Sequence, residues 1–305
     1  MSAAQNLTGK ENIYLGIRPY GFHAGNMMPF VVYPLLLCRQ MEKLGKQIQF
    51  NFYIFINDWE QDKLDGPDPK TYIFNIYPQK TTFQFTYSVE DPSKTVVDYW
   101  EPVILKRVNQ LKKYYPKITI KAVRNSSMKN HPLMKRCLLK TIEHPELLAD
   151  VFRKYTDKVV LEQPVQYAMA ICPKCHLAKG STFVRGNNII HKCENCYQES
   201  TGKYQDFEYW FYHKPLAIPR LEIYNIDLCI TGADHYSEGD FIVRQKLIDF
   251  FNSKAKYPQT LYTPIVLGRN GLVMGKSKNN TETIPLKKLI KLVTNSPFDS
   301  TIQIA

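Results

Sequence analysis

The sequence predicts an α/β fold built on a parallel β-sheet, and two observations support this prediction. A strand-like segment, a helix-like segment and a second strand-like segment follow one another within about 45 residues near the start of the chain, as in a βαβ unit. Strand-like and helix-like segments alternate again in the last third of the chain. The 305 residues are 44% hydrophobic and 22% charged, which is typical of a globular protein and excludes a disordered, collagen-like or coiled-coil chain.

The βαβ unit begins with a short apolar run at residues 13–17, which suits a buried strand. After a Gly-containing turn, residues 27–44 are expected to form a helix that is kinked at Pro34 and ends before Gly45. Residues 48–56, rich in Phe, Tyr and Ile, are expected to form the second strand.

The middle of the chain is predicted to be helical and is strongly basic. Apolar residues recur at helical spacing between positions 97 and 115, and residues 133–142 and 145–155 are two further expected helices. Residues 91–160 hold 15 Lys and Arg against 7 Asp and Glu, which is two thirds of the formal net charge of +12. This concentration favours a polyanionic partner such as RNA, and a generally lysine-rich proteome is the alternative explanation.

The last third of the chain is expected to return to the sheet. Its expected elements are a strand at residues 221–230, a helix at 241–251, a strand at 262–267 and a helix at 286–293. The predicted organisation is a first half of an α/β domain at residues 1–85, an inserted module at 86–205, and the second half at 206–305.

The N-terminal segment argues for a cytoplasmic location. Residues 1–11 are polar and show no secretory signal, and the apolar stretch at residues 27–38 contains two prolines and is too short to span a bilayer. We therefore expect no membrane association.

Four of the seven cysteines form two C-x-x-C pairs, separated by 17 residues. The pairs are Cys172 with Cys175 and Cys193 with Cys196. This spacing predicts a closed four-thiolate site for a structural Zn²⁺ ion, with a small hairpin between the pairs. Disulfides, which the cytosol disfavours, and an iron–sulfur site are the alternatives.

Two loops could bind an anion. In the turn after the first strand, Gly21 and Gly25 allow close backbone approach, and His23 and Asn26 supply donors at the start of a helix. Residues 274–280, Met-Gly-Lys-Ser-Lys-Asn-Asn, offer cations and hydroxyls to a polyphosphate. Each signal alone is weak, because solvated histidines and exposed Lys-Ser-Lys loops are common.

Taken together, these motifs resemble class I aminoacyl-tRNA synthetases over residues 13–293. The turn at residues 23–26 is similar to their HIGH signature, and residues 274–277 are similar to KMSKS. Residues 232–235, Gly-Ala-Asp-His, resemble the turn that holds the ATP ribose. Residues 55–59, Phe-Ile-Asn-Asp-Trp, and the four-cysteine module resemble the class I lysyl enzymes, and all five elements occur in the family's order.

This resemblance implies a Rossmann-like parallel sheet that binds ATP with Mg²⁺ and activates an amino acid, with lysine weakly favoured. The product would be an aminoacyl-adenylate, whose aminoacyl group passes to tRNA or another acceptor, with the basic segment 91–160 holding the RNA. By analogy, the residues acting in catalysis would be His23, Asn26 and Lys276. Those contacting ATP would be Gly21, Gly25, Gly232, Asp234, Met274 and Ser277. Candidate amino-acid readers are Asp58, Trp210 and Tyr236.

The sequence also departs from the family pattern. Val273 and Gly275 occupy the places of the first Lys and the Ser of KMSKS, and the turn before His23 is one residue shorter than usual. Only 25 residues follow Asn280, so we expect no anticodon-binding domain in this chain. A non-catalytic synthetase paralogue that binds RNA or nucleotide therefore remains an alternative, as does another nucleotidyl-transfer enzyme of the same superfamily.

Overall fold

The computed structural model describes residues 5–61, 81–155, 166–233, 235, 240–268, 271, 284–294 and 302–303. Its centre is a five-stranded parallel sheet in the order β10-β9-β1-β2-β3. These strands are β1 (Asn12–Ile17), β2 (Asn51–Ile56), β3 (Thr119–Arg124), β9 (Leu228–Gly232) and β10 (Gln259–Thr263). The predicted α/β class with a Rossmann-like parallel sheet is therefore confirmed.

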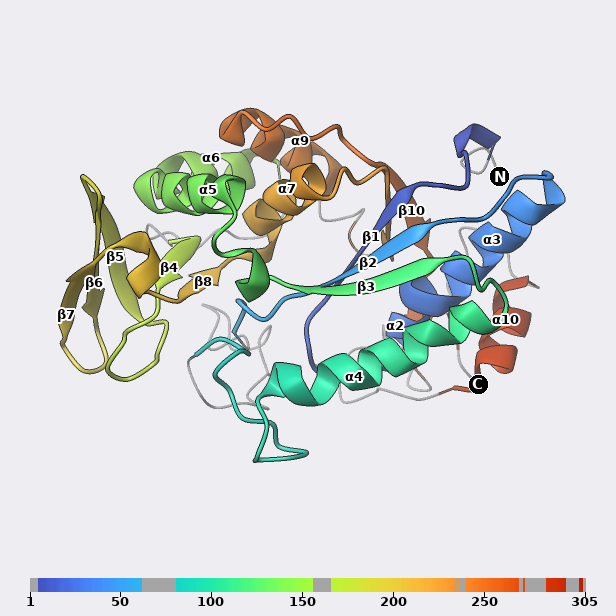
Figure 1. Cartoon of the computed structure of the whole chain (residues 1–305), viewed down its shortest axis with the longest axis horizontal. Coiled ribbons are helices and arrows are strands. Elements are labelled where there is room, and N and C mark those ends of the chain that lie inside the picture. Colours follow the sequence, from blue (N-terminus) through green and yellow to red (C-terminus); the bar gives the residue numbers. More distant parts are fainter. Residues whose placement is uncertain are drawn as a thin grey trace.

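Helices cover both faces of the sheet, which makes a three-layer structure (Figure 1). On one face pack α2 (Ala24–Met27), the π-helical turn η1 (Met28–Val32), α3 (Tyr33–Lys43), α4 (Val96–Val108) and α10 (Leu286–Thr294). On the other lie α5 (Pro132–Glu143), α6 (Pro145–Tyr155), α7 (His213–Ile223) and α9 (Asp240–Phe251). The expected helices at 133–142, 145–155, 241–251 and 286–293 are thus confirmed.

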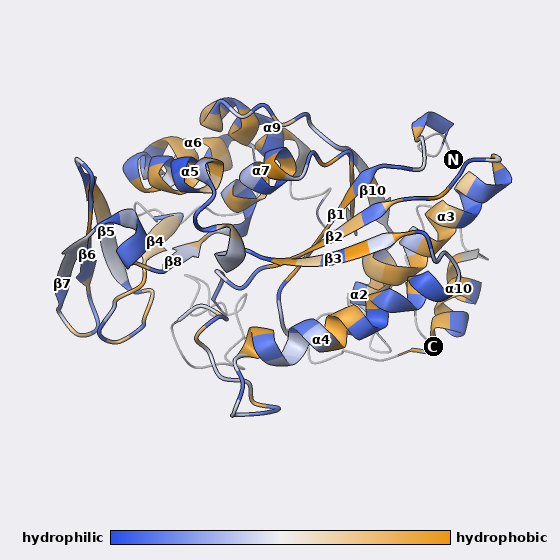
Figure 2. Cartoon of the chain, viewed as in Figure 1, coloured by the Kyte–Doolittle hydropathy of each residue, from blue (hydrophilic) through white to orange (hydrophobic). Residues whose placement is uncertain are grey.

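Burial on both faces explains the composition of the central strands. In β1, Ile13 and Leu15 point into one hydrophobic core, whereas Tyr14 points into the other. A parallel strand that is covered on both sides has no solvated face and is therefore apolar almost throughout. Figure 2 shows β1 and β2 as mostly hydrophobic, while the helices that cover them carry both hydrophobic and hydrophilic surfaces.

Two small antiparallel sheets follow α6 in the chain. The strands β4 (Ala168–Ala170) and β8 (Tyr209–Phe211) form an antiparallel pair. Next to them, β5 (Gly180–Arg185), β6 (Asn188–Cys193) and β7 (Glu199–Gly202) form a three-stranded antiparallel sheet at the left edge of Figure 1. The predicted hairpin between the cysteine pairs is therefore confirmed, with Gly186 at φ 57° in its turn.

The remaining described elements are short. They are the 3₁₀ turns η2 (Asn109–Lys113), η3 (Ser126–Met128) and η4 (Tyr204–Asp206), and the paired strands β11 (Val266–Leu267) and β12 (Ile302–Gln303). Among the described helices, none combines the length and hydrophobicity required to span a lipid bilayer.

Two expectations about local structure were wrong, and one strand was missed. The strand expected at 221–230 is the end of helix α7 followed by β9, because residues 221–223 continue a buried helix that contains two prolines. The helix expected at 27–44 begins earlier, at Ala24, and its irregularity is the π-turn η1 rather than a kink at Pro34. Strand β3 was not expected at all, and it extends the main sheet into the segment assigned to the insertion.

Candidate active site

A cavity of about 280 Å³ lies at the carboxyl ends of β1 and β9. The strand order reverses between these two strands. On one side of β1 the sheet continues with β2 and β3, and on the other side it continues with β9 and β10. In open parallel sheets such a switch point forms a crevice in which ligands bind. The described lining is formed by Gly16, His23, Gly25, Asn26, Pro29, Phe30, Ile230, Thr231, Gly232, His235, Thr263, Pro264, Ile265 and Val266.

The turn that carries His23 is fixed by a reciprocal cap at the start of α2. The imidazole Nδ1 of His23 accepts a hydrogen bond from the Gly25 N–H at 3.1 Å, and Asn26 Oδ1 accepts one from the His23 N–H at 3.2 Å. An accepting Nδ1 places the ring proton of neutral His23 on Nε2, so Nε2–H is the donor of this side chain. Because the amide oxygen of Asn26 serves the backbone, its NH₂ group is the part that can serve a ligand.

The cavity brings together residues that are distant in the sequence. His23, Gly25 and Asn26 of the first turn line it together with Gly232, the last residue of β9. Gly21 lies in the same turn as His23 with φ 65°, where glycine is favoured, but it is not part of the described lining. The other predicted ligand contacts, Asp234, Tyr236, Met274, Lys276 and Ser277, lie outside the described residues.

Sequence reasoning assigned no role to two polar residues of this cavity. Thr231 precedes Gly232 at the end of β9, and His235 follows shortly after it, so two imidazoles line one cavity. His235 was visible as part of the Gly-Ala-Asp-His motif, but nothing in the motif showed that its side chain shares a cavity with His23. The lining thus offers hydrogen-bond donors and backbone amides, and it includes no carboxylate among its described residues.

An Arg–Glu–His cluster around the buried Glu60 lies beyond the carboxyl ends of β1 and β2. Glu60 accepts from Arg18 Nε at 3.1 Å and contacts His213 Nδ1 at 2.6 Å. Burial alone would raise the pKa of Glu60, but the Arg18 charge and the His213 hydrogen bond hold it well below its usual value. Burial lowers the pKa of His213 despite Glu60, so His213 is a neutral donor to an ionised carboxylate at pH 7.

No sequence pattern indicated the role of Arg220, a residue of α7 whose side chain is fully buried. Its guanidinium donates to Tyr14 Oη at 2.7 Å, to Asn57 Oδ1 at 2.6 Å and to Asn125 Oδ1 at 2.5 Å. It also lies over the ring of Phe55, 5.4 Å from the centroid. All these side-chain partners are neutral, and the buried carboxylate of Asp58 accepts from the backbone of Asn125 beside them.

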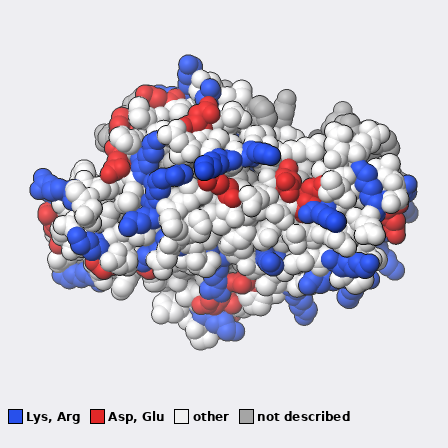
Figure 3. Space-filling view, turned by 45° about the horizontal axis from the view of Figure 1, so that its top comes forward, with Lys and Arg blue, Asp and Glu red and all other residues white. Residues whose placement is uncertain are grey.

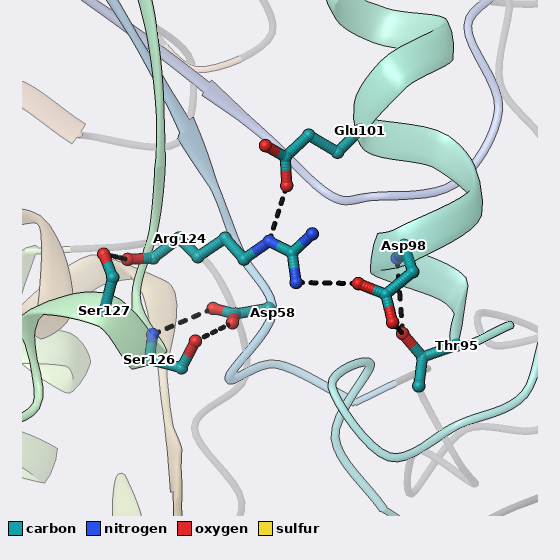
Figure 4. Close-up of polar contacts among 7 residues, drawn as sticks. All are labelled: Asp58, Thr95, Asp98, Glu101, Arg124, Ser126 and Ser127. Carbon is teal, nitrogen blue, oxygen red and sulfur yellow. Dashed lines mark hydrogen bonds and ion pairs between the residues drawn. The ribbon is translucent and has the colours of Figure 1, made fainter.

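The predicted amino-acid readers Asp58 and Trp210 do not line the described cavity. Asp58 is fully buried, and its carboxylate accepts from the Ser126 N–H at 3.2 Å and the Ser126 hydroxyl at 2.5 Å (Figure 4). Trp210 is paired with Met169 between β8 and β4. The hypothesis that these two side chains read an amino acid therefore gains no support from the cavity.

Asp58 leads to a prediction about pH. Burial raises its pKa to about 6, although the Ser126 hydrogen bonds and the Arg124 charge act in the opposite direction. The native state therefore binds a proton more tightly than the unfolded state, and the free energy of unfolding falls as pH rises from 4 to 6. Asp58→Asn removes this dependence. Between pH 4 and 7 the wild type should lose on the order of 2–3 kcal/mol relative to the variant.

Urea unfolding at several pH values measures this difference. The control is Ser127→Ala, which removes the hydroxyl that donates to the Arg124 carbonyl and leaves Asp58 in place. It should show the pH dependence of the wild type. Parallel curves for wild type and Asp58→Asn across this range would contradict the prediction.

The four cysteines of the two C-x-x-C pairs come together as predicted. Their sulfur atoms all lie within 4.8 Å of one another, with 3.5 Å between Cys172 and Cys196 and 3.6 Å between Cys175 and Cys193. Tetrahedral Zn–S bonds of 2.3 Å place sulfur atoms about 3.8 Å apart, and a disulfide requires about 2.05 Å. The donor set therefore fits a zinc ion and not two disulfides.

Two of the four sulfurs are buried, those of Cys172 and Cys193. Burial works to raise the pKa of the Cys193 thiol, but hydrogen bonds from the backbone N–H groups of Cys196 and Asn195 and from the neighbouring thiols lower it to about 7. A closed site of four thiolates leaves no coordination position for a substrate, so its expected role is structural.

No protein-family model and no curated protein sequence matches the chain. Similar solved structures include a tyrosyl-tRNA synthetase from Archaeoglobus fulgidus, at 16% identity and a TM-score of 0.47. The match covers 92% of this chain and 63% of the synthetase chain. A putative arginyl enzyme from Campylobacter jejuni has 13% identity and a TM-score of 0.41, covering 99% of this chain and 68% of that one.

The tryptophanyl-tRNA synthetase of Campylobacter jejuni is similar at 12% identity and a TM-score of 0.37, covering 95% of this chain and 67% of that one. The named enzymes are class I synthetases for several amino acids, and the specific grouping with lysyl enzymes is not supported. At these identities and TM-scores, the similarity does not by itself assign a substrate or an activity.

Proposed function

We propose that this protein activates an amino acid with ATP, in the manner of class I aminoacyl-tRNA synthetases, and transfers it to tRNA or another acceptor. The observation that supports the proposal best is the cavity itself. Two motifs separated by about 200 residues, at His23–Asn26 and at Gly232, line one cavity at the switch point of a parallel sheet. ATP is the expected occupant of that cavity.

In the proposed reaction, the amino-acid carboxylate attacks the α-phosphate of ATP and pyrophosphate leaves. Chemistry of this kind requires positioning and positive electrostatics more than a nucleophilic side chain. The Nε2–H of His23 and the amide of Asn26 would donate to phosphate oxygens, and Gly25 would allow the triphosphate to lie close to the backbone. Mg²⁺ bound to the triphosphate would neutralise part of its charge.

The second half of the site would hold the rest of the nucleotide. Gly232 and Asp234 would contact the ribose, and Met274, Lys276 and Ser277 would hold the β- and γ-phosphates. The positive charge of Arg220, which has only neutral partners among the described residues, lies at the same edge of the sheet and suits anionic ligands.

Pyrophosphate exchange with each of the twenty amino acids tests the proposal. Exchange should occur with one or a few of them and reveal the substrate. Lys276→Ala should lower the exchange rate roughly tenfold and weaken ATP binding much less, because Lys276 would act on charge that develops as pyrophosphate leaves. Lys254→Ala, on an exposed lysine after α9, is the matched control and should leave both unchanged. No exchange with any amino acid, using folded zinc-loaded protein, would contradict the proposal.

The second candidate is a non-catalytic paralogue that binds nucleotide or RNA. Val273 and Gly275, which replace two residues of the KMSKS-like loop, favour it. Calorimetry with ATP and Mg²⁺ separates the candidates further. A chain that binds ATP without exchanging pyrophosphate is a nucleotide-binding paralogue, and a chain that does neither has kept the fold and lost the chemistry.

RNA is the expected acceptor because of the basic segment 91–160. Figure 3 shows Lys and Arg side chains gathered in a band on one face of the molecule. Part of this charge is neutralised, since Arg124 pairs with Asp98 and Glu101 (Figure 4). Lys135 and Arg136 on α5 are exposed and have no carboxylate partner within the described residues. These two cations are the expected phosphate contacts.

A further inference from the structure

The sheet β5-β6-β7 has one covered face and one open face. The strand register places Thr182 opposite His191, and both side chains are fully buried, as is nearly all of Ile189. This covered face packs against β4 and α5. Residues that alternate with these along each strand point to the opposite, open face. On that face the side chain of Phe183 is 49% exposed.

The open face has an apolar row with cations at its margins. Phe183 is paired with Ile190, and Ile190 is paired with Thr201, so one row crosses all three strands. Lys192 flanks this row on one side. Arg185 flanks it on the other.

The positive charges of this face are available to a ligand. Arg185 has no acidic partner in the described chain, and Lys203 donates to the neutral Asn188 Oδ1 at 2.8 Å. Lys192 pairs with Glu199 at 3.3 Å, but both side chains are more than half exposed, and such a pair is weak. Three cations and one carboxylate therefore surround the apolar row.

Further cations lie near the end of β7, where the chain meets α5. After Lys203 the chain enters η4, where the ring of Tyr204 lies under the ammonium of Lys135, 5.3 Å from the centroid. Arg136 follows Lys135 on the exposed side of α5. Lys135 and Arg136 are therefore a second group of cations beside the edge of the sheet at which Lys203 lies.

We propose that the open face of β5-β6-β7 binds single-stranded RNA, with a base stacked on Phe183 and phosphates held by Arg185, Lys192 and Lys203. Exposed aromatic rings stack on unpaired bases, and neighbouring cations hold the backbone. Duplex RNA is excluded as the ligand of this face, because its bases are already stacked within the helix. The inference deepens the proposed function, since it gives the RNA acceptor a contact outside segment 91–160.

The test is fluorescence anisotropy with zinc-loaded full-length protein, a labelled unstructured 12-nucleotide RNA and a labelled duplex of the same length. The single strand should bind more tightly than the duplex, with an affinity that falls steeply as salt rises. Phe183→Ala should weaken binding roughly tenfold or more. Phe183→Trp should preserve binding, whereas Phe183→Leu, which keeps an apolar side chain but cannot stack, should weaken it.

Two controls make the result specific. Leu44→Ala truncates an apolar side chain that is 41% exposed at the end of α3, outside segment 91–160 and away from this sheet in the sequence, and should leave binding unchanged. Arg185→Ala should lower the slope of log affinity against log salt by about one. Equal affinities for Phe183→Ala, Phe183→Leu and wild type would overturn the inference. So would an absence of oligonucleotide binding, which would point to a protein partner for the face.

The outcome is independent of the proposed catalysis. Phe183→Ala should keep the wild-type rate of pyrophosphate exchange, because Phe183 is not part of the cavity lining. If exchange occurs and the Phe183 variants bind RNA like the wild type, the inference alone fails. If no amino acid supports exchange and the Phe183 variants lose RNA binding, the proposed activation fails and the RNA face remains.

Discussion

Arg220→Met is expected to lower the free energy of unfolding by about 3–5 kcal/mol. The guanidinium of Arg220 is fully buried and donates to Tyr14, Asn57 and Asn125. Methionine fills much of the volume but donates no hydrogen bond, so three buried acceptors lose their partner. Each buried polar group left unpaired costs roughly 1–3 kcal/mol. Local repacking is expected to recover part of the sum.

Urea unfolding followed by circular dichroism measures the loss. Arg136→Met is the matched control, because the same substitution on the exposed side of α5 should change stability by less than about 0.5 kcal/mol. Arg220→Lys should recover only part of the loss, since one ammonium cannot replace the planar fork at three acceptors. Equal stability of Arg220→Met and wild type would show that the network is replaceable.

The same network supports the wall of the cavity. Gly16 lines the cavity, and a Cβ atom at this position would lie only 2.9 Å from Tyr14 Oη, which Arg220 holds in place. If Arg220→Met folds at low temperature, ATP binding should therefore weaken together with stability. Stability measurements and calorimetry on the same preparation connect the two effects.

Cys193→Ser is expected to abolish zinc binding and to unfold the sheet β5-β6-β7. Cys193 ends β6 and is 4% exposed, and its sulfur lies among the other three. A structural zinc site contributes folding free energy directly, about 10–16 kcal/mol in small zinc-finger peptides, and serine replaces the thiolate poorly. One zinc ion per chain is expected in the wild type and none in the variant. Limited proteolysis should cut the variant within residues 172–203.

Cys38→Ser is the matched control for this experiment. Cys38 is a fully buried thiol in α3 and belongs to neither C-x-x-C pair, so its replacement should leave the zinc content at one. Elemental analysis identifies the metal, and a visible absorbance band would indicate an iron–sulfur cluster instead. A zinc-free wild type with an ordered sheet, or a variant with full zinc content, would contradict the prediction.

Local patterns predicted those parts of the protein that depend on near neighbours in the chain. The metal site could be predicted because each C-x-x-C brings its two thiols together by spacing alone. The hairpin between the two pairs then brings one pair next to the other. The amphipathic helices α5 and α6 were readable for the same reason, since a buried stripe recurs every three to four residues. The parallel sheet followed from the order of these segments.

Strand β3 shows where local patterns fail. Its sequence, Thr-Ile-Lys-Ala-Val-Arg, is only half apolar, because this edge strand also carries the charged residues Lys121 and Arg124. The prediction for helix α7 failed for the opposite reason. It is buried almost throughout and contains Pro219, so it has neither a polar face nor an uninterrupted helical pattern, and an apolar segment of this kind resembles a buried strand.

The sequence by itself determined the α/β class, the cysteine cluster, the turn at His23 and the basic segment, because each depends on composition or on residues close in the chain. Only the tertiary structure decided which residues share a site. Arg220 is 206, 163 and 95 positions from Tyr14, Asn57 and Asn125, and His23 meets Gly232 only because β1 and β9 are neighbours. Strand pairing over such separations is set by the packing of the whole core, which no local pattern encodes.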